Sequence, residues 1–324
     1  MDILVLGGTQ FIGKAIVEEL LRRGHHVAIF HRGKTGAGLF PECTHILGDR
    51  NTDLDRADTQ EWDAVIDVSC YTPNQARSAG KLRTKYFAFI STISVYDFTT
   101  EKQPYDVQTP MVPGQEGNDV TMATYGPLKV RCEEVFAEAF AGRLGIVRPG
   151  IVFGPYDPTG RFPYWITRLD EFEEVLIPDV RSNPVQGIDV FDLAEFTVEV
   201  TEKSLAGTWN AVGPKVTFGD VIDEIRSQVG KEHHLVLASV DELNENEVKM
   251  WSELPLTFEP GTRESVFNFN PQHAFEAGLK HRTIQETIRA TLAWTRSGDY
   301  PKDAKYGMSR EKEVAVLEKL KAKA

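Results

Sequence analysis

The stretch GGTQFIG, residues 7–13, decides the fold, because it joins the apolar run DILVL at 2–6 to apolar residues at helical spacing. The start of the chain therefore predicts a strand, a glycine-rich turn and a helix in succession. A helix N-terminus offers free N–H groups and a partial positive charge, which suit a pyrophosphate. The other interpretation is a turn that only joins a strand to a helix.

The individual residues of this turn have separate roles. Gly7 can take the tight turn after the strand, and Gly13 lets the helix lie close on the sheet. Thr9 and Gln10 can both present backbone N–H groups. A side chain at Gln10, where a glycine would be easier, hinders close approach of the backbone to a ligand without forbidding it.

Further strand-like runs continue this pattern along the chain. They are HVAIFHR (26–32), THILGD (44–49), WDAVIDVS (62–69), YFAFISTISVY (86–96) and LGIVRPG (144–150). Strand runs separated by helices or loops predict an α/β fold, a Rossmann-type doubly wound parallel sheet with a smaller C-terminal substrate-binding region. We expect the sheet domain to contain residues 1–150 and about 185–213, and the substrate region about 151–184 and 214–300. A charged helix is expected over 301–324.

Composition narrows the class of protein. The chain has 324 residues, of which 41% are hydrophobic and 26% charged, and its net charge is −12. Phosphate binding depends on Lys and Arg, so this charge makes nucleic acid an unlikely main partner. No apolar run reaches the roughly 18 residues of a membrane span. The first strand starts at once, and three scattered cysteines lack metal-ligand spacing, so we expect a cytoplasmic protein with reduced thiols. No metal site is predicted.

The end of the second strand bears on the choice of dinucleotide. Folds that prefer NAD usually place an acid there, about 20 residues after the turn. This strand instead ends in His31-Arg32-Gly33, and a guanidinium at Arg32 suits a 2′-phosphate. The sequence thus favours NADP(H), with NAD(H) as the alternative. Arg32 could equally be a solvated residue at the start of a loop. Asp49, at the end of the third strand, could reach the adenine ring.

A second candidate site is the segment YGPLK at 125–129. Tyr125 and Lys129 are four residues apart, so on a helix they share a face. Pro127 is tolerated only in a first turn, so the helix must begin close to Tyr125. An ammonium nearby lowers the pKa of a phenol, which allows it to exchange protons with a substrate. A surface Tyr–Lys pair is the alternative for this spacing alone.

The third catalytic group is expected from the hydroxyls at the end of the run 86–96. Ser91 and Thr92 stand there, and either could bond the oxygen that Tyr125 protonates. They could also be strand hydroxyls that the backbone satisfies.

Together these segments resemble the extended short-chain dehydrogenase/reductase superfamily, in its NAD(P)-dependent epimerase/dehydratase branch. The resembling segments are GGTQFIG, HRG, GDR at 48–50, STISVY, YGPLK, RPGIVFGP and IDVFDLA, and they span roughly residues 1–300. Within this branch, the segments are most similar to an isoflavone-reductase-like or sugar-epimerase-like subset, which is related to chloroplast stem-loop RNA-binding proteins. That subset shares the departure at Gln10.

The resemblance implies roles for particular residues. Tyr125 would be the acid/base, Lys129 would hold the nicotinamide ribose, and Thr92 would complete the centre. The cofactor contacts would be Gly7, Thr9, Gln10, Phe11, Ile12, Gly13, His31, Arg32, Asp49, Pro149 and Ile151. The residues expected to line the substrate pocket are Tyr71, Tyr156, Arg161 and Gln186, although Arg161 could instead form a structural ion pair.

Departures from the family limit the reaction. Sugar-nucleotide 4,6-dehydratases follow the hydroxyl residue with Asp-Glu, whereas Ile93 and Ser94 follow Thr92 here. Ile151 replaces an asparagine usual in nucleotide-sugar epimerases, and an arginine that grips diphosphate is missing near Gln186. We therefore expect a redox enzyme or epimerase acting on a small molecule other than a nucleotide sugar, with a homodimer as one assembly. The alternative is a non-catalytic dinucleotide-sensing or RNA-binding protein.

Overall fold

The computed structural model describes residues 1–100, 103–301 and 303–323, and these divide into two compact units. Unit 1 contains residues 1–151, 190–212 and 269–280. Unit 2 contains residues 152–189, 213–268 and 281–324. The chain passes between the units several times, so neither unit is one continuous segment.

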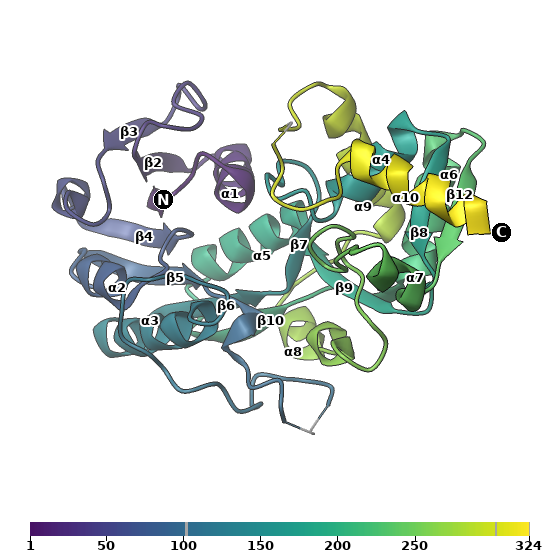
Figure 1. The fold of residues 1–324 in the computed structure, drawn as a ribbon. Helices are drawn as coiled ribbons and strands as arrows, with labels where there is room; N and C mark the ends of the chain where they lie inside the picture. Colours follow the sequence, from purple (N-terminus) through teal and green to yellow (C-terminus); the bar gives the residue numbers. More distant parts are fainter. Residues whose placement is uncertain (101–102, 302, 324) are drawn as a thin grey trace. The chain divides into compact units, whose positions relative to one another are not determined.

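Unit 1 is built on a seven-stranded sheet in which every neighbouring pair is parallel (Figure 1). The strand order is β10-β6-β5-β4-β1-β2-β3, which reverses direction between β1 and β4. The predicted Rossmann-type sheet is confirmed. Its strands are β1 (Asp2–Leu6), β2 (His26–His31), β3 (Thr44–Leu47), β4 (Trp62–Asp67), β5 (Thr84–Ile90), β6 (Leu144–Pro149) and β10 (Gly207–Ala211).

Helices cover this sheet in pairs: α1 packs against α5, and α2 packs against α3 (Figure 1). The aromatic ring of Phe87 in β5 stacks on Phe140 at 4.3 Å and packs at a tilt against Phe136 at 4.7 Å, which fixes α3 on the sheet. The helical segments of unit 1 are α1 (Phe11–Arg22), η1 (Leu54–Ala57), α2 (Pro73–Ala79), η2 (Ile93–Val95), α3 (Tyr125–Ala139), α5 (Val190–Glu202) and α8 (Gln272–Glu276).

Unit 2 has two small sheets. One has the order β11-β9-β7, from β7 (Ile151–Phe153), β9 (Pro184–Asp189) and β11 (Lys215–Thr217), and β7 starts at the boundary of the units. The other pairs β8 (Glu174–Pro178) with β12 (His234–Ala238). The helical segments are α4 (Pro163–Glu171), α6 (Phe218–Val229), α7 (Val240–Glu245), η3 (Glu264–Phe267), α9 (Ile284–Arg296) and α10 (Arg310–Lys323).

The element boundaries differ from the expected ones at several places. The runs 44–49, 62–69 and 86–96 end as strands at Leu47, Asp67 and Ile90, because the chain turns where polar residues begin. Residues 184–189 form β9 in unit 2 instead of joining the large sheet, and 269–280 return to unit 1. The C-terminal helix begins only at Arg310 and buries Val316 and Leu317; Lys302 and Ala324 of the expected range lie outside the described residues.

The turn between β1 and α1 depends on two glycines. Gly7 has φ +95°, a backbone conformation that L side chains rarely adopt. A Cβ added at Gly13 would lie 2.0 Å from the carbonyl oxygen of Gly7, far inside van der Waals contact. The first turn of α1 thus lies directly on the glycine turn, which is possible only without a side chain at position 13.

We predict that Gly13→Ala destabilises the protein by about 1–3 kcal/mol, because overpacking outweighs the better helix propensity of alanine. Denaturant unfolding followed by circular dichroism measures this free energy. The control is Gly38→Ala, since a Cβ at Gly38 would have nothing within 4 Å. Equal stability of the Gly13→Ala and Gly38→Ala variants would refute the close packing of α1 on the turn.

Candidate active site

The candidate site lies at the carboxyl ends of β1 and β4, where the strand order reverses and where open α/β sheets bind ligands. Gln10 is the N-cap of α1 in an extended conformation, with φ −147° and no capping hydrogen bond from its side chain. The first turn of α1 carries no acidic residue. The helix N-terminus therefore keeps its positive end for an anion, and the exposed side chain of Gln10 does not occupy it.

A buried ion pair lies beneath this turn. Arg50 donates to both carboxylate oxygens of Asp67, from Nη1 at 2.8 Å and Nη2 at 2.9 Å. Arg50 Nη1 also donates to Ser69 Oγ at 2.8 Å, and Ser69 Oγ donates to the carbonyl oxygen of Leu6 at 3.1 Å. Burial disfavours the charge on Arg50, but the attraction of Asp67 outweighs it and raises the pKa of the guanidinium. The segments that follow β1, β3 and β4 are thereby linked.

Cationic side chains lie near Asp49, beyond β2 and β3. Arg32 and Lys34 are exposed. The carboxylate of Asp49 accepts hydrogen bonds from the backbone N–H of Asn51 at 2.9 Å and from its side-chain amide at 2.7 Å. These bonds, together with the charges of Arg32 and Lys34, lower the pKa of Asp49. Two cations and one tightly held carboxylate therefore share this edge.

The ring of His31 is engaged with the loop that follows β2. Its Nδ1 accepts from the backbone N–H of Gly33 at 3.2 Å, and its Nε2 lies 2.8 Å from Nδ1 of His45. His45 Nε2 in turn lies 3.0 Å from the carbonyl oxygen of Phe40. These contacts fit a series of hydrogen bonds in which both imidazoles are neutral. Burial and the neighbouring His45 lower the pKa of His31. His31 thus holds the start of the loop that follows β2.

Lys129 is buried, with 2% of its surface exposed. Its Nζ donates to the carbonyl oxygens of Ile90 at 2.7 Å and Cys70 at 2.9 Å, and it lies 4.1 Å from the centre of the Phe89 ring. An ammonium has three N–H donors, so these two bonds leave one for a further acceptor. The ammonium also lies 5.7 Å from the ring centre of Tyr71, whose ring is 6.4 Å from that of Tyr125.

Gly126 lets the start of α3 pack against the segment that follows Thr92. Thr92 caps η2: its Oγ1 accepts from the backbone N–H of Ser94 at 3.1 Å and donates to Ser94 Oγ at 3.2 Å. A Cβ added at Gly126 would lie 2.2 Å from the carbonyl oxygen of Ser94. The first turn of α3, which begins at Tyr125 as Pro127 predicted, therefore packs against the segment that carries Thr92.

Ser91, the other hydroxyl of the pair, is held elsewhere. It donates to Glu133 Oε1 at 2.5 Å, and Glu133 also pairs with Arg148 at 2.5 Å. Arg148 Nη1 also donates a hydrogen bond to the hydroxyl oxygen of Tyr96 at 2.8 Å. Because Ser91 is committed to this buried network, Thr92 is the hydroxyl that remains at the end of β5 near Tyr125.

The remaining predicted residues fall at the junction or in unit 2. Pro149 ends β6, and Ile151 begins β7. In unit 2, Tyr156 has φ +70° and Arg161 stacks 4.6 Å from the ring centre of Tyr306. Gln186 is buried and donates to the carbonyl oxygen of Gly213 at 3.0 Å. The assignment of these residues to cofactor and substrate stays a prediction.

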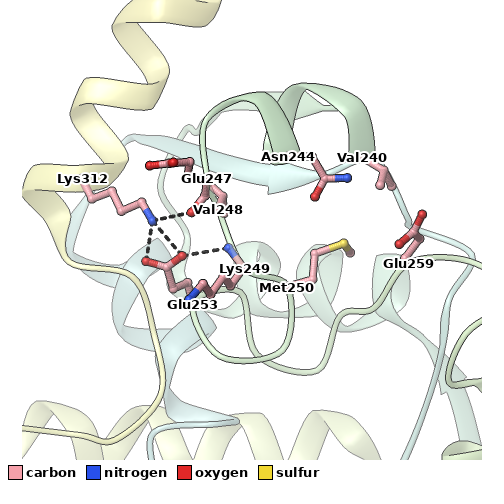
Figure 2. A pocket seen from close by; sticks show the side chains of 9 residues that line it. All are labelled: Val240, Asn244, Glu247, Val248, Lys249, Met250, Glu253, Glu259 and Lys312. Atoms are coloured by element: carbon pink, nitrogen blue, oxygen red, sulfur yellow. Dashed lines mark hydrogen bonds and ion pairs between the residues drawn. The ribbon is translucent and has the colours of Figure 1, made fainter.

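Unit 2 also contains a cavity of about 850 Å³ beside α7 and α10 (Figure 2). Lys312 enters it and donates to both carboxylate oxygens of Glu253, at 2.7 and 2.8 Å. None of the predicted site residues lines this cavity, and the charges of Lys312 and Glu253 neutralise each other. The lining is formed by Val240, Asn244, Glu247, Val248, Lys249, Met250, Glu253, Glu259 and Lys312.

Within the described residues, no group of three or more His, Cys, Asp or Glu side chains could hold a metal ion. None of the helices over the same residues is long and apolar enough to cross a membrane. The three cysteines are free thiols and are buried.

Sequence reasoning missed several residues that shape this site. They are the buried side chains of Arg50, Asp67 and Glu133 and the half-buried side chain of Ser69. A signal for two of them was present, since Asp67 and Ser69 follow an apolar run directly. The contacts of Arg50 with Asp67 and Ser69 span 17 and 19 residues of sequence, which no local pattern encodes.

Residues 3–76 match the model of the NAD dependent epimerase/dehydratase family. No curated protein matches the chain in sequence. The fold is shared with solved structures of low identity, one being the Bordetella bronchiseptica enzyme WbmH in complex with NAD+, which is 18% identical with TM-score 0.71, covering 91% of this chain and 98% of that one.

Two further structures have the same fold. UDP-glucose 4-epimerase from Thermotoga maritima with UDP-glucose is 18% identical with TM-score 0.68, covering 92% of this chain and 99% of that one. dTDP-glucose 4,6-dehydratase from Bacillus anthracis in complex with NAD is 14% identical with TM-score 0.68, covering 92% and 97%. The match over residues 3–76 is to the epimerase/dehydratase family that the sequence resembles, and the fold agrees with that resemblance. The narrower isoflavone-reductase-like subset stays a prediction.

We predict that acid destabilises the protein through His31. Its folded-state pKa lies below the usual value near 6.5, so the unfolded chain takes up the proton first. This contribution to stability is complete above about pH 6.5 and is lost as the pH falls below it. Urea unfolding between about pH 7.5 and 5.5 should show a decline that His31→Asn reduces. His26→Asn, at an exposed histidine, is the control, and an unchanged pH profile in His31→Asn would contradict the assignment.

Proposed function

We propose that this chain is an NAD(P)-dependent oxidoreductase or epimerase of the extended short-chain dehydrogenase/reductase type. The observation that carries the proposal is the buried ammonium of Lys129, one helical turn after Tyr125, which the carbonyl oxygens of Cys70 and Ile90 hold at the ends of the strands. The family match over residues 3–76 supports the same conclusion. The substrate is a small carbonyl or alcohol compound.

The residues at the carboxyl ends of β1 and β4 fit a dinucleotide. Gly7 and Gly13 let α1 pack directly on the tight turn, where a side chain would clash with Ser69 or with the carbonyl oxygen of Gly7. The N-terminus of α1 has neither a side-chain cap nor an acid in its first turn. The pyrophosphate would be held by the backbone of residues 9–13, and Asp49 would lie towards the adenine. A bound nicotinamide supplies the hydride donor or acceptor.

The protein's own residues supply the proton chemistry. Tyr125 gives a proton to the substrate oxygen on reduction and takes it back on oxidation. Lys129 favours the phenolate through its charge, and its remaining N–H can bind a ribose hydroxyl. Thr92 donates a hydrogen bond to the same substrate oxygen after turning from Ser94, to which it is weakly bonded at 3.2 Å.

An epimerase and a reductase differ in how they treat the cofactor. An epimerase returns the hydride to the other face of the substrate and often keeps its dinucleotide, whereas a reductase exchanges it. Native mass spectrometry of the purified protein, with absorbance at about 340 nm for the reduced nicotinamide, distinguishes the two. Protein that carries no dinucleotide and binds none when it is added would refute the proposal. Steeply salt-dependent binding of a structured RNA without turnover would favour the non-catalytic alternative.

We predict that Tyr125→Phe lowers turnover about 100- to 10,000-fold while dinucleotide affinity stays nearly constant, because only the transferable proton is removed. Turnover is measured on a carbonyl or alcohol that the wild-type protein converts, and affinity by calorimetry. Tyr86→Phe is the matched control: the hydroxyl of Tyr86 bonds to the carbonyl oxygen of Leu205, near the amino end of β5. Full activity of Tyr125→Phe would exclude this tyrosine as the acid/base.

Arg32 supports a preference for NADP(H), because its exposed guanidinium and Lys34 place positive charge at the end of β2. We predict that Arg32→Ala weakens NADP⁺ binding about tenfold and NAD⁺ binding much less, through loss of a charge-assisted hydrogen bond. Arg83→Ala, at an exposed arginine paired with Asp58, is the control. Equal losses for the two dinucleotides would contradict the preference.

A further inference from the structure

We propose that Arg50 is a positioning residue for the dinucleotide: through Ser69 it fixes the glycine turn in the conformation that receives the pyrophosphate. This inference rests on the proposed function and adds to it a residue outside the predicted cofactor contacts. Arg50 stands at the carboxyl end of β3, next to Asp49. Its guanidinium acts on the turn after β1, which is distant in sequence.

The hydroxyl of Ser69 links the guanidinium of Arg50 to the backbone of Leu6. Ser69 Oγ accepts from Arg50 Nη1 at 2.8 Å and donates to the carbonyl oxygen of Leu6 at 3.1 Å. Its backbone N–H donates to Asp67 Oδ1 at 3.0 Å. Leu6 directly precedes Gly7, so the peptide plane at the start of the turn is held by a hydrogen bond that Arg50 orients.

Ser69 also touches the turn itself. A Cβ at Gly7 would lie 2.8 Å from Ser69 Cβ and 2.9 Å from Ser69 Oγ. The side chain of Ser69 thus occupies the space next to the Cα of Gly7, and a displacement of Ser69 moves the turn with it. Binding geometry must be held within about 0.5 Å by supporting residues, so such a displacement should reduce the affinity for a pyrophosphate.

Arginine is suited to this role where lysine is not. The planar guanidinium binds both oxygens of Asp67 and still presents Nη1 to Ser69, whereas an ammonium is a point charge without that fork. Arg50 Nε has no hydrogen-bond partner among the described residues, so the pair is not fully compensated for its burial. A buried ion pair is weak evidence for stability, and apolar replacements of both members are often tolerated.

That tolerance allows stability and positioning to be separated. The double variant Arg50→Met/Asp67→Leu removes both buried charges together, so the core stays free of an unpaired ion. Ser69→Ala keeps the ion pair and removes the hydroxyl that links Arg50 to the carbonyl oxygen of Leu6. Arg50→Lys keeps the charge and loses the fork. Arg83→Met is the control, because Arg83 pairs with Asp58 on the surface of unit 1.

The readouts are the thermal midpoint and the dissociation constants for NAD⁺ and NADP⁺ by calorimetry. We expect the double variant and Ser69→Ala to keep midpoints within a few degrees of the wild type. Their dinucleotide affinities should fall about tenfold or more, Arg50→Lys should be intermediate, and Arg83→Met unchanged.

Wild-type affinity in folded double and Ser69→Ala variants would overturn the positioning role. If the double variant does not fold, Ser69→Ala decides alone, since it leaves both charges paired. Wild-type protein that binds neither dinucleotide would instead refute the proposed function, which separates that failure from the failure of this inference.

Discussion

The arrangement of the candidate site depends on one constraint, the burial of the Lys129 ammonium. A buried charge must be compensated, and here the carbonyl oxygens of Ile90 and Cys70 do so. Ile90 ends β5 and Cys70 follows β4, so a single side chain of α3 fixes the ends of two strands against the helix. Glu133, one turn further along α3, binds Ser91 and Arg148 and extends the same connection to β6. The orientation of Tyr125 at the start of α3 follows from these contacts.

The glycine turn accommodates Gln10 because the strain is carried elsewhere. Gln10 is extended, so its side chain points to solvent without cost. The positive φ angles fall at Gly7, with +95°, and at Phe11, with 43°. Glycine adopts such angles freely, but a phenylalanine does not, and non-glycine residues with positive φ cluster at ligand sites. The turn is therefore shaped by Gly7, Phe11 and Gly13, and a side chain at position 10 is compatible with an open helix N-terminus.

The sheet and the start of α3 could be predicted from sequence, because apolar runs and Pro127 impose local conformations. Residues 185–189, expected in the sheet domain, belong to unit 2, since a short strand does not show which sheet it will join. The ring contact of His31 with His45 and the ion pair of Arg50 with Asp67 could not be predicted either. The first contact joins the neighbouring parallel strands β2 and β3, and the second joins β4 to the loop after β3, with β1 and β2 between them in the sheet, so both depend on the arrangement of the whole sheet. In the second unit, Arg161 contacts Tyr306, which lies 145 positions away in the sequence.

Burial of charge alone does not mark a functional site, as unit 2 demonstrates. Glu313 of α10 is fully buried, pairs with Arg168 at 2.9 Å and with Arg310 at 2.6 Å, and accepts from the backbone N–H of Leu176 at 3.0 Å. Leu176 lies within β8, so this carboxylate satisfies the edge of a two-stranded sheet that would otherwise expose its backbone. Lys129 and Arg50 differ because they bind at the carboxyl ends of parallel strands, where the chain leaves the sheet and a ligand can approach. Position relative to the sheet, more than burial, distinguishes a charge that supports chemistry from one that closes an edge.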